Sequence, residues 1–582
     1  MHVLLVHPED SPRQGPWTLR RWDLIVDLGK SSEFSERAWS EQYGCPVLRL
    51  ESFRQGISDV KRVRQILSAG RGRLLDEEGI DWWELVSLPV VPEALSLLAL
   101  ERAAPQIPPS AELWATRQGW PVETLAVLAG LRCQNFGAGF VARLAGGASH
   151  YAGLLRRFSV AQIKEIFLDK YDSGYRWRSR FAVRPKRSAN PVVLLPSSYG
   201  NVSRMGAAYA RLLPQQSFLM VATRQSAKRF TPPANVQVRD LAAYASAGTS
   251  TPEAGALVKR WYELKKDLAS SSESRALIRT GVLNGVPGWI RDGIGARDAW
   301  REVMEREPAC GVLCGDDSNR YTRLPVLLAA RRKLPTVDFH HGAFDGRPLL
   351  KDLPCDVYLA KNEMERDYLV RVCGLPGEKI MTGAIPRQER SASETDAGAT
   401  AAVFFSEPYE AAGMRAEEVY REILPALCRL AREYGRRVIL KLHPFESRSQ
   451  RSQPLRDILT SEDHQLVTVQ DGPLTDELLA KAWFGITVES TTVMDCLERG
   501  VCCFLCGWLT LSPYEYAQQY ARFGVGEVLQ SAEQIREIPV RAEGFRKRGA
   551  ITSKLPDPID PARFERWLTC GVHEPSAARP AS

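Results

Sequence analysis

The chain has 582 residues, which is too long for one ordinary domain and predicts about two to four of them. Apolar residues make up 44% and charged residues 25%, proportions typical of a soluble globular protein, which excludes wholesale disorder and a polytopic membrane protein. Lys and Arg number 77 against 69 Asp and Glu, a net charge of +8. Over this length the charge is mild; it fits anionic ligands or an anionic membrane surface and excludes nucleic acid as the expected partner.

The cysteines and the apolar runs indicate a cytoplasmic protein. The twelve cysteines are scattered, and no CxxC pair faces a second pair or a His pair, so no zinc site is expected. The start Met1–Asp10 is too short and too soon acidic for a signal peptide and predicts a first strand. The longest apolar stretch, Leu85–Leu100, contains Pro89, Pro92 and Glu93, which excludes a spanning helix. We expect the cytoplasm, including the inner face of its membrane.

Strands and helices alternate over the first two thirds of the chain. Between about residues 59 and 169 the pattern is mostly helical. A helix opened by Ser250–Glu253 has an apolar face at spacings of four, three and four: Leu257, Trp261, Leu264 and Leu268. Short apolar runs predict strands at Val3–Val6, Leu24–Val26, Val192–Leu195, Phe218–Ala222, Gly311–Cys314, Thr336–Phe339 and Val357–Leu359. This pattern predicts a doubly wound parallel sheet with a helical insertion, over residues 1–386.

A second alternating series follows a segment without apolar anchors, residues 387–400, which we interpret as a linker. A helix at Ala416–Tyr434 is closed by Gly435. The expected strands are Val403–Phe405, Val438–Leu442, Leu466–Val469, Phe484–Val488 and Val501–Leu505. Residues 401–573 are therefore predicted as a second doubly wound domain and residues 574–582 as a tail. Ligands of such sheets bind at the carboxyl ends of the strands.

The strongest motif of the second domain is Phe484–Gly500, in which a strand runs into Ser490, Thr491 and Thr492 and then a helix. Free N–H groups at a helix start together with three hydroxyls form a cradle for an anion, so phosphate binding is predicted. The alternative is an ordinary N-cap, which needs one hydroxyl only.

The run Val438–Pro444 delivers Lys441 and His443 to the same sheet edge. A cation and an imidazole there can bind a diphosphate or neutralise a leaving phosphate. The alternative is that Lys441 extends to solvent and His443 satisfies a loop carbonyl.

Two motifs of the first domain hold candidate bases. His341, before Gly342 and after the Thr336–Phe339 strand, is placed to act as general base on an acceptor hydroxyl, or else is a structural histidine bonded to its turn. Asp316 and Asp317 follow another strand, where one is a candidate base of raised pKa. They lack the DxD spacing of a metal site, and their alternative role is to form a turn and helix cap.

The loop Val192–Ser203 carries Ser197, Ser198 and Asn201, which we assign to the acceptor side, with a plain surface turn as the alternative. Neither GxGxxG nor the P-loop pattern occurs between a strand and a helix. A Rossmann dehydrogenase and a P-loop NTPase are therefore not expected.

Several of these motifs together resemble a known family over about Cys310–Phe504. They occur in the order His341-Gly342, Cys355–Glu363, Gly374, Gly383–Pro386, Lys441–Pro444 and Glu489–Thr492. This order resembles the bacterial surface-polysaccharide transferases of the GT-B class. These include the CDP-glycerol glycerophosphotransferases and the capsule-type enzymes that use CMP-activated Kdo or sialic acid. The first 190 residues match no family that we can name.

The resemblance implies roles for individual residues. It makes His341 the base and places His443 on the donor phosphate, which Ser490, Thr491 and Thr492 also grip. The acidic motif of the CMP-sialic acid enzymes has its nearest match at Asp316-Asp317, where Ser318 replaces the expected glycine. Ala343–Asp345 stands where the glycerophosphotransferases have a Thr-Pro-Leu run, which favours a sugar over glycerol phosphate.

We therefore expect a metal-independent GT-B glycosyltransferase that moves a sugar from a cytidine-activated nucleotide donor to a surface polysaccharide or lipid-linked glycan. It is expected to need no cofactor, to bind no nucleic acid and to contact the membrane peripherally. The expected donor-binding residues are Lys441, His443, Glu489, Ser490, Thr491 and Thr492. The alternatives are a nucleotide-sugar 2-epimerase, a CDP-glycerol glycerophosphotransferase, and a non-catalytic glycan- or nucleotide-binding partner in a synthesis complex.

Overall fold

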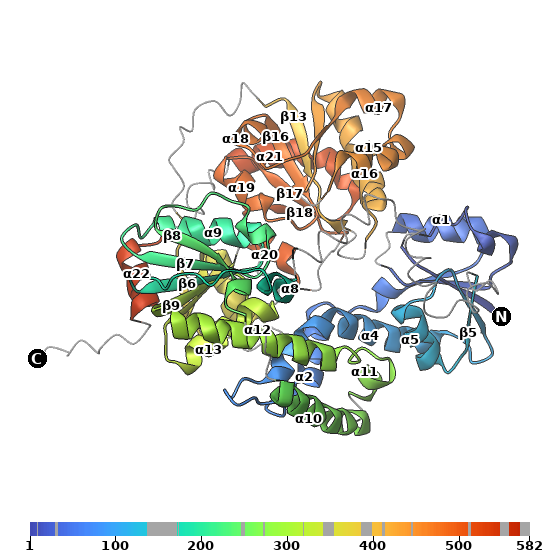
Figure 1. Cartoon of the computed structure of the whole chain (residues 1–582). Coiled ribbons are helices and arrows are strands. Elements are labelled where there is room, and N and C mark those ends of the chain that lie inside the picture. The colour runs from blue at the N-terminus through green and yellow to red at the C-terminus, as the bar shows by residue number, and fades with distance from the viewer. Residues whose placement is uncertain are drawn as a thin grey trace, which may run out of the picture. The chain divides into compact units, whose positions relative to one another are not determined.

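The computed structural model is shown in Figure 1. It describes residues 1–8, 10–29, 33–136, 172, 174–245, 251–271, 274–317, 319–340, 354–385, 399–409, 414–443, 446–509, 514–547 and 558–570. The chain divides into two compact units, each built from separate stretches of sequence. The first unit holds Met1–Val60, Leu95–Gly139 and Gln388–Leu555, and the second holds Lys61–Ala94, Phe140–Arg387 and Pro556–Ser582.

The described residues form three sheets, and every strand pair in them is parallel. In each sheet the first strand lies in the interior, the next two extend to one side and the later strands to the other. This is the doubly wound order, with a switch point beside the first strand. The predicted α/β class with doubly wound sheets is thus confirmed.

The smallest sheet has the order β3-β2-β1-β4-β5. Its strands are β1 (His2–Val6), β2 (Leu24–Asp27), β3 (Val47–Arg49), β4 (Glu112–Ala115) and β5 (Cys133–Asn135). The helices within the first 136 residues are α1 (Glu33–Tyr43), α2 (Ile57–Ser68), α3 (Trp82–Ser87), α4 (Val91–Ala103) and α5 (Trp120–Ala129). Residues 59–136 therefore include helices, as expected, but also β4 and β5 of this smallest sheet, so the helical-insertion prediction is corrected there.

The largest sheet has the order β12-β11-β10-β9-β6-β7-β8. Its strands are β6 (Val192–Ser197), β7 (Ser217–Ala222), β8 (Val236–Asp240), β9 (Ala309–Cys314), β10 (Thr336–Phe339), β11 (Val357–Ala360) and β12 (Ile380–Thr382). The helices of this region are α8 (Tyr175–Ser179), α9 (Gly200–Arg211), α10 (Thr251–Ser270), α11 (Arg275–Arg279), α12 (Val286–Arg306), α13 (Arg320–Arg331) and α14 (Glu363–Asp367). All four residues of the predicted apolar face of α10 are buried, which confirms its periodicity.

The third sheet has the order β15-β14-β13-β16-β17-β18. Its strands are β13 (Ala401–Phe405), β14 (Arg437–Lys441), β15 (Val467–Gln470), β16 (Ala482–Thr487), β17 (Cys503–Cys506) and β18 (Glu527–Leu529). The accompanying helices are α15 (Ala416–Glu433), α16 (Arg448–Ile458), α17 (Ser461–Leu466), α18 (Asp476–Ala480), α19 (Thr492–Glu498), α20 (Tyr516–Arg522) and α21 (Ile538–Lys547). This sheet and the largest one are the two doubly wound sheets that the sequence predicted, but β1 and β2, which were assigned to the first domain, belong to the smallest sheet instead.

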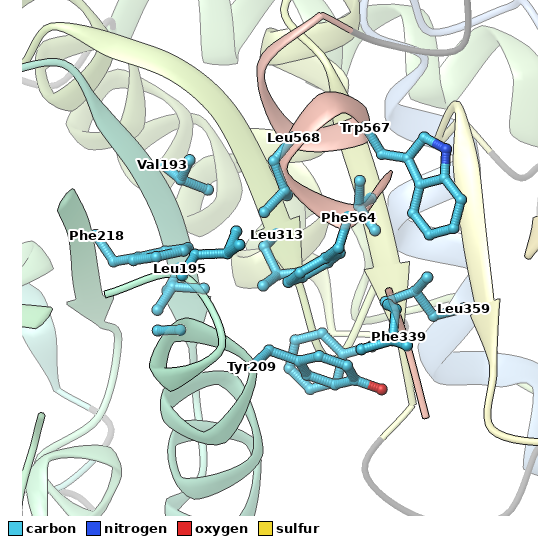
Figure 2. Close-up of a cluster of buried hydrophobic side chains, with 14 of the residues drawn as sticks. Val193, Leu195, Tyr209, Phe218, Leu313, Phe339, Leu359, Phe564, Trp567 and Leu568 are labelled. Atoms are coloured by element: carbon cyan, nitrogen blue, oxygen red, sulfur yellow. The ribbon is translucent and has the colours of Figure 1, made fainter. Parts of the chain in front are cut away.

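The last helix, α22 (Pro561–Thr569), packs on the largest sheet rather than on the third one. Figure 2 shows Phe564, Trp567 and Leu568 of this helix in one buried cluster with Leu313 and Phe339 of the strands. The predicted second domain, residues 401–573, is therefore corrected at its end, because residues from Pro556 onward belong to the unit of the largest sheet. Most of the predicted linker and the whole predicted tail lie outside the described residues.

One continuous helical stretch, Trp82–Gln106, is long and apolar enough to cross a membrane, with a mean hydropathy of 1.5. In the most apolar part of this stretch 67% of the residues are buried inside the protein. Burial of this kind is typical of the core helix of a globular domain.

Candidate functional site

The switch point of the third sheet lies between β13 and β16, which are adjacent and parallel. Loops that follow neighbouring parallel strands gather at one edge of a sheet, and ligands of doubly wound folds bind there. All the predicted donor-binding residues lie at or just after the carboxyl ends of β14 and β16, so this edge is the candidate site.

A carboxylate that the sequence analysis did not select, Glu407, organises this edge. It follows β13, and its Oε1 atom accepts hydrogen bonds from the Thr487 hydroxyl at 2.8 Å and from the backbone N–H groups of Val488 at 3.0 Å and Glu489 at 2.8 Å. Burial raises the pKa of the Glu407 carboxyl, and the hydrogen bonds from the loop oppose the rise. Glu407 thus ties the loop after β16 to the end of β13, across the switch point.

The hydroxyl run after β16 is divided between local capping and the site edge. The Ser490 hydroxyl accepts the N–H of Thr492, the first residue of α19, at 3.3 Å, from the position just before the N-cap. Thr491 occupies the N-cap position of α19 without a side-chain cap. The hydroxyl oxygen of Thr492 is buried and has no hydrogen-bond partner among the described residues. Two of the three predicted hydroxyls are therefore not used in capping α19.

The anion-cradle interpretation changes in one respect. The N–H groups of Val488 and Glu489 point to the carboxylate of Glu407, an anion that belongs to the protein. They are occupied in this structure. A ligand phosphate at this edge is left with side-chain hydroxyls and with the residues after β14.

His443 stands at the end of the strand β14 and is half-buried. Its backbone N–H donates to Glu446 Oε2 at 2.9 Å, and Arg451 holds the other carboxylate oxygen of Glu446 with Nη2 at 2.6 Å. Burial lowers the pKa of the imidazole; the nearby Lys441 ammonium lowers it further, and Glu446 opposes both. The imidazole is therefore neutral at neutral pH and can donate one N–H to a phosphate oxygen.

Lys441 faces inward rather than toward solvent. Its Nζ atom donates to the backbone carbonyls of Leu442 and Gly472, each at 2.7 Å. Burial lowers the pKa of this ammonium. Lys441 therefore acts on the site indirectly: it holds two loop carbonyls, and its positive charge lowers the pKa of His443.

In the largest sheet, Asp316 and Asp317 follow β9, as predicted, and both side chains are buried. Asp317 Oδ2 accepts Arg323 Nη1 at 3.0 Å. The fully buried Arg323 also pairs with Glu84. This contact commits Asp317 to bracing α13, whereas Asp316 is left as the acidic candidate base on this strand.

The structure predicts that Asp317→Asn lowers the free energy of unfolding by about 1–2 kcal/mol, because Arg323 would keep a neutral acceptor but lose a charged one. Urea unfolding followed by circular dichroism measures the change. Asp316→Asn is the matched control and is expected to be milder. A wild-type midpoint for Asp317→Asn would remove Asp317 from the bracing role.

The predicted acceptor-side residues separate into buried and exposed groups. The Ser197 hydroxyl bonds that of Ser203 at 2.7 Å, and the Ser198 hydroxyl bonds that of Thr223 at 2.8 Å; both serines are buried. Their hydroxyls hold the loop after β6, so the assignment of Ser197 and Ser198 to a ligand surface is corrected. Asn201 is exposed. The predicted base His341 lies outside the described residues.

Two functional candidates, Glu407 and Glu446, were missed by sequence reasoning. The signal for Glu407 was present, because an acidic residue directly follows a buried strand at Phe405-Ser406-Glu407. Glu446 is three residues after His443, in a segment that no sequence pattern distinguished from a polar loop. Both carboxylates act on loop backbone.

No protein-family model matches the chain, and no curated protein matches it. Among solved structures, a UDP-GlcNAc 2-epimerase from Neisseria meningitidis bound to UDP-GlcNAc is similar, with 14% identity, a TM-score of 0.42, and coverage of 65% of this chain and 99% of that one. A glycosyltransferase from Rickettsia africae has 8% identity and a TM-score of 0.40, covering 65% and 98%. MurG of Acinetobacter baumannii has 10% identity and a TM-score of 0.35, covering 66% and 99%. Since these scores are below 0.5, the function must rest on the residues of this chain.

Proposed function

We propose that the protein is a cytoplasmic GT-B glycosyltransferase that moves a sugar from a cytidine-activated nucleotide donor to a surface polysaccharide or lipid-linked glycan. The observation that supports it most is at the switch point of the third sheet. A neutral, half-buried imidazole, His443, and the hydroxyls that follow β16 occur there at the carboxyl ends of β14 and β16, the two strands that flank β13. This combination suits the phosphate of a nucleotide.

In the proposed reaction an acceptor hydroxyl oxygen bonds to the anomeric carbon of the donor sugar while the bond from that carbon to the phosphate oxygen breaks. The proton of the hydroxyl passes to a base, His341 or Asp316, and the nucleotide leaves with the bonding electrons. His443 donates to the leaving phosphate, and Thr491 supplies a further hydroxyl. The proposal requires no metal ion and no cofactor.

The remaining residues position these groups. Glu407 fixes the loop after β16, and Glu446 fixes the backbone of His443. Glu489, half-buried beside the hydroxyl run, is proposed to contact the nucleotide ribose. Such fixed geometry matters because a donor group must already be in place when charge develops on the phosphate.

We expect CMP or CDP to raise the melting temperature of the protein more than UDP or GDP does, because a ligand that binds only the native state stabilises it. Differential scanning fluorimetry at matched nucleotide concentrations measures the shift. An equal shift with His443→Ala would place the nucleotide elsewhere, and a shift with none of the four would contradict the proposed donor.

The epimerase alternative uses the same sheet edge but differs in whether an acceptor is needed. An epimerase would consume UDP-GlcNAc with no acceptor present, whereas the proposed transferase requires an added glycan. Product analysis by nuclear magnetic resonance separates them. A protein that binds nucleotide and turns over neither substrate would instead be the non-catalytic partner of a synthesis complex.

A further inference from the structure

A short stretch of the second unit, residues 176–187, leaves apolar and cationic side chains together on the surface. Trp177, Phe181 and Val183 are 51%, 72% and 86% exposed, values unusual for side chains of this kind. Four cations among them are exposed as well: Arg180, Arg184, Lys186 and Arg187. We call these seven residues the basic-aromatic surface.

The local fold turns the two aromatic rings of this surface outward. Tyr175 and Arg178, one helical turn apart on α8, are buried. Arg178 is bonded to the carboxylate of Asp240 and to the carbonyl of Thr223. The residues between and after them, Trp177 and Phe181, therefore face outward, with their rings edge to face at 5.4 Å.

Beside these rings lies an open hollow of about 540 Å³. Its polar members, Arg178, Gln225, Arg239 and Asp240, are bonded to one another or to other protein groups. What the hollow leaves for a partner is mainly its apolar wall of Trp177, Phe181, Ala182, Val183 and Pro185. This wall offers little to a small polar ligand.

The charge of the surface has one sign. Residues 173–187 contain no Asp or Glu. Within the described part of the chain, Arg180, Arg184, Lys186 and Arg187 have no acidic partner within 4 Å. Elsewhere on the molecule exposed cations are commonly paired along helices, as Arg371 is with Asp367. Cations without an acidic partner, placed around exposed apolar side chains, are complementary to a partner that has both anionic and apolar groups.

We propose that the basic-aromatic surface docks the protein on a bilayer of anionic lipid. The cations would lie at the headgroups while Trp177, Phe181 and Val183 enter the boundary with the acyl chains. A nucleic acid offers phosphate and faces for stacking, but it has no place for Val183, the most exposed of the three. The proposal does not depend on the transfer reaction proposed above.

Flotation of the full-length protein with vesicles tests the proposal. Binding to mixed phosphatidylcholine–phosphatidylglycerol vesicles is expected, with much weaker binding to pure phosphatidylcholine and a decline as salt is raised. Reversing three cations, with Arg184→Glu, Lys186→Glu and Arg187→Glu, is expected to weaken binding by about 100-fold or more. Replacing the apolar pair, with Phe181→Ser and Val183→Ser, is expected to weaken it by about tenfold.

Matched controls use exposed residues of other elements. Lys259→Glu, Arg260→Glu and Lys266→Glu reverse three exposed cations of α10, while Tyr262→Ser and Val540→Ser remove two exposed apolar side chains. These controls should bind vesicles like wild type, and circular dichroism should show all variants folded. Equal loss in the controls, equal binding to neutral vesicles, or binding to single-stranded polynucleotide without binding to vesicles would overturn the proposal.

Discussion

Glu407→Ala is expected to lower the free energy of unfolding by about 3 kcal/mol or more, one of the largest effects of any single change at the candidate site. The carboxylate is buried and accepts three hydrogen bonds through one oxygen, from Thr487, Val488 and Glu489. Alanine would remove the acceptor of the Val488 and Glu489 N–H groups, would leave the Thr487 hydroxyl with only the Phe405 carbonyl, and would open a cavity at the switch point. Urea unfolding measures the loss.

Glu407→Gln is the matched control. The amide oxygen can take the place of Oε1 and accept the same three donors, so a much smaller loss is expected. Nucleotide binding should follow the same order, because the loop after β16 is held by these bonds. Equal destabilisation by alanine and glutamine would mean that the charge, and not the accepting oxygen, holds the loop.

The pH dependence gives an independent check. Burial raises the folded-state pKa of Glu407 above its ordinary value, so the folded protein holds this proton to a higher pH than the unfolded chain does. The contribution to stability is then fully present below the ordinary carboxyl pKa and is lost as pH rises through the raised one. Glu407→Gln removes this step, so wild type should lose stability relative to that variant as pH increases over this window.

The large features of the fold could be predicted because their signals are local. Short apolar runs with helices between them marked most strands of the two larger sheets, though not β8, β12 or β18, and the apolar face of α10 was correct at every position. The smallest sheet was not predicted as a separate sheet, and the reason is physical. Its strands β4 and β5 are short and mix polar residues with apolar ones, and its remaining strands precede a long helical region.

Other features depended on contacts distant in sequence, which no local pattern reports. The return of α22 to the largest sheet becomes visible only when Phe564 meets Tyr209, at a ring distance of 5.5 Å. Likewise, Asp317 looked like a base until Arg323 and Glu84 were placed beside it. Which of the predicted side chains already bond within the protein could be seen only in the structure.

The hydrogen bonds within the protein determine which groups at this sheet edge can contact a phosphate. Glu407 accepts the backbone N–H groups of Val488 and Glu489, and Lys441 donates hydrogen bonds to two backbone carbonyls. Of the predicted donor-binding groups, His443 has the side chain best suited to meet a ligand. The imidazole therefore carries the largest share of the proposed phosphate recognition.

His443→Ala is accordingly expected to lower turnover by about 100-fold or more while the protein stays folded. The structural part of this residue is its backbone N–H, which donates to Glu446 and is kept in alanine. Stability should therefore change little, and the melting-temperature shift with the preferred nucleotide should be lost. Activity with each candidate donor and scanning fluorimetry give the two measurements.

A second histidine of the same unit supplies the control. His464, exposed on α17, can be replaced by alanine without touching this sheet edge, and wild-type turnover is expected. His443→Gln keeps an N–H donor and should recover part of the nucleotide shift, because the neutral imidazole acts as a donor of one hydrogen bond. Near wild-type turnover of His443→Ala with the preferred donor would remove the donor site from the end of β14.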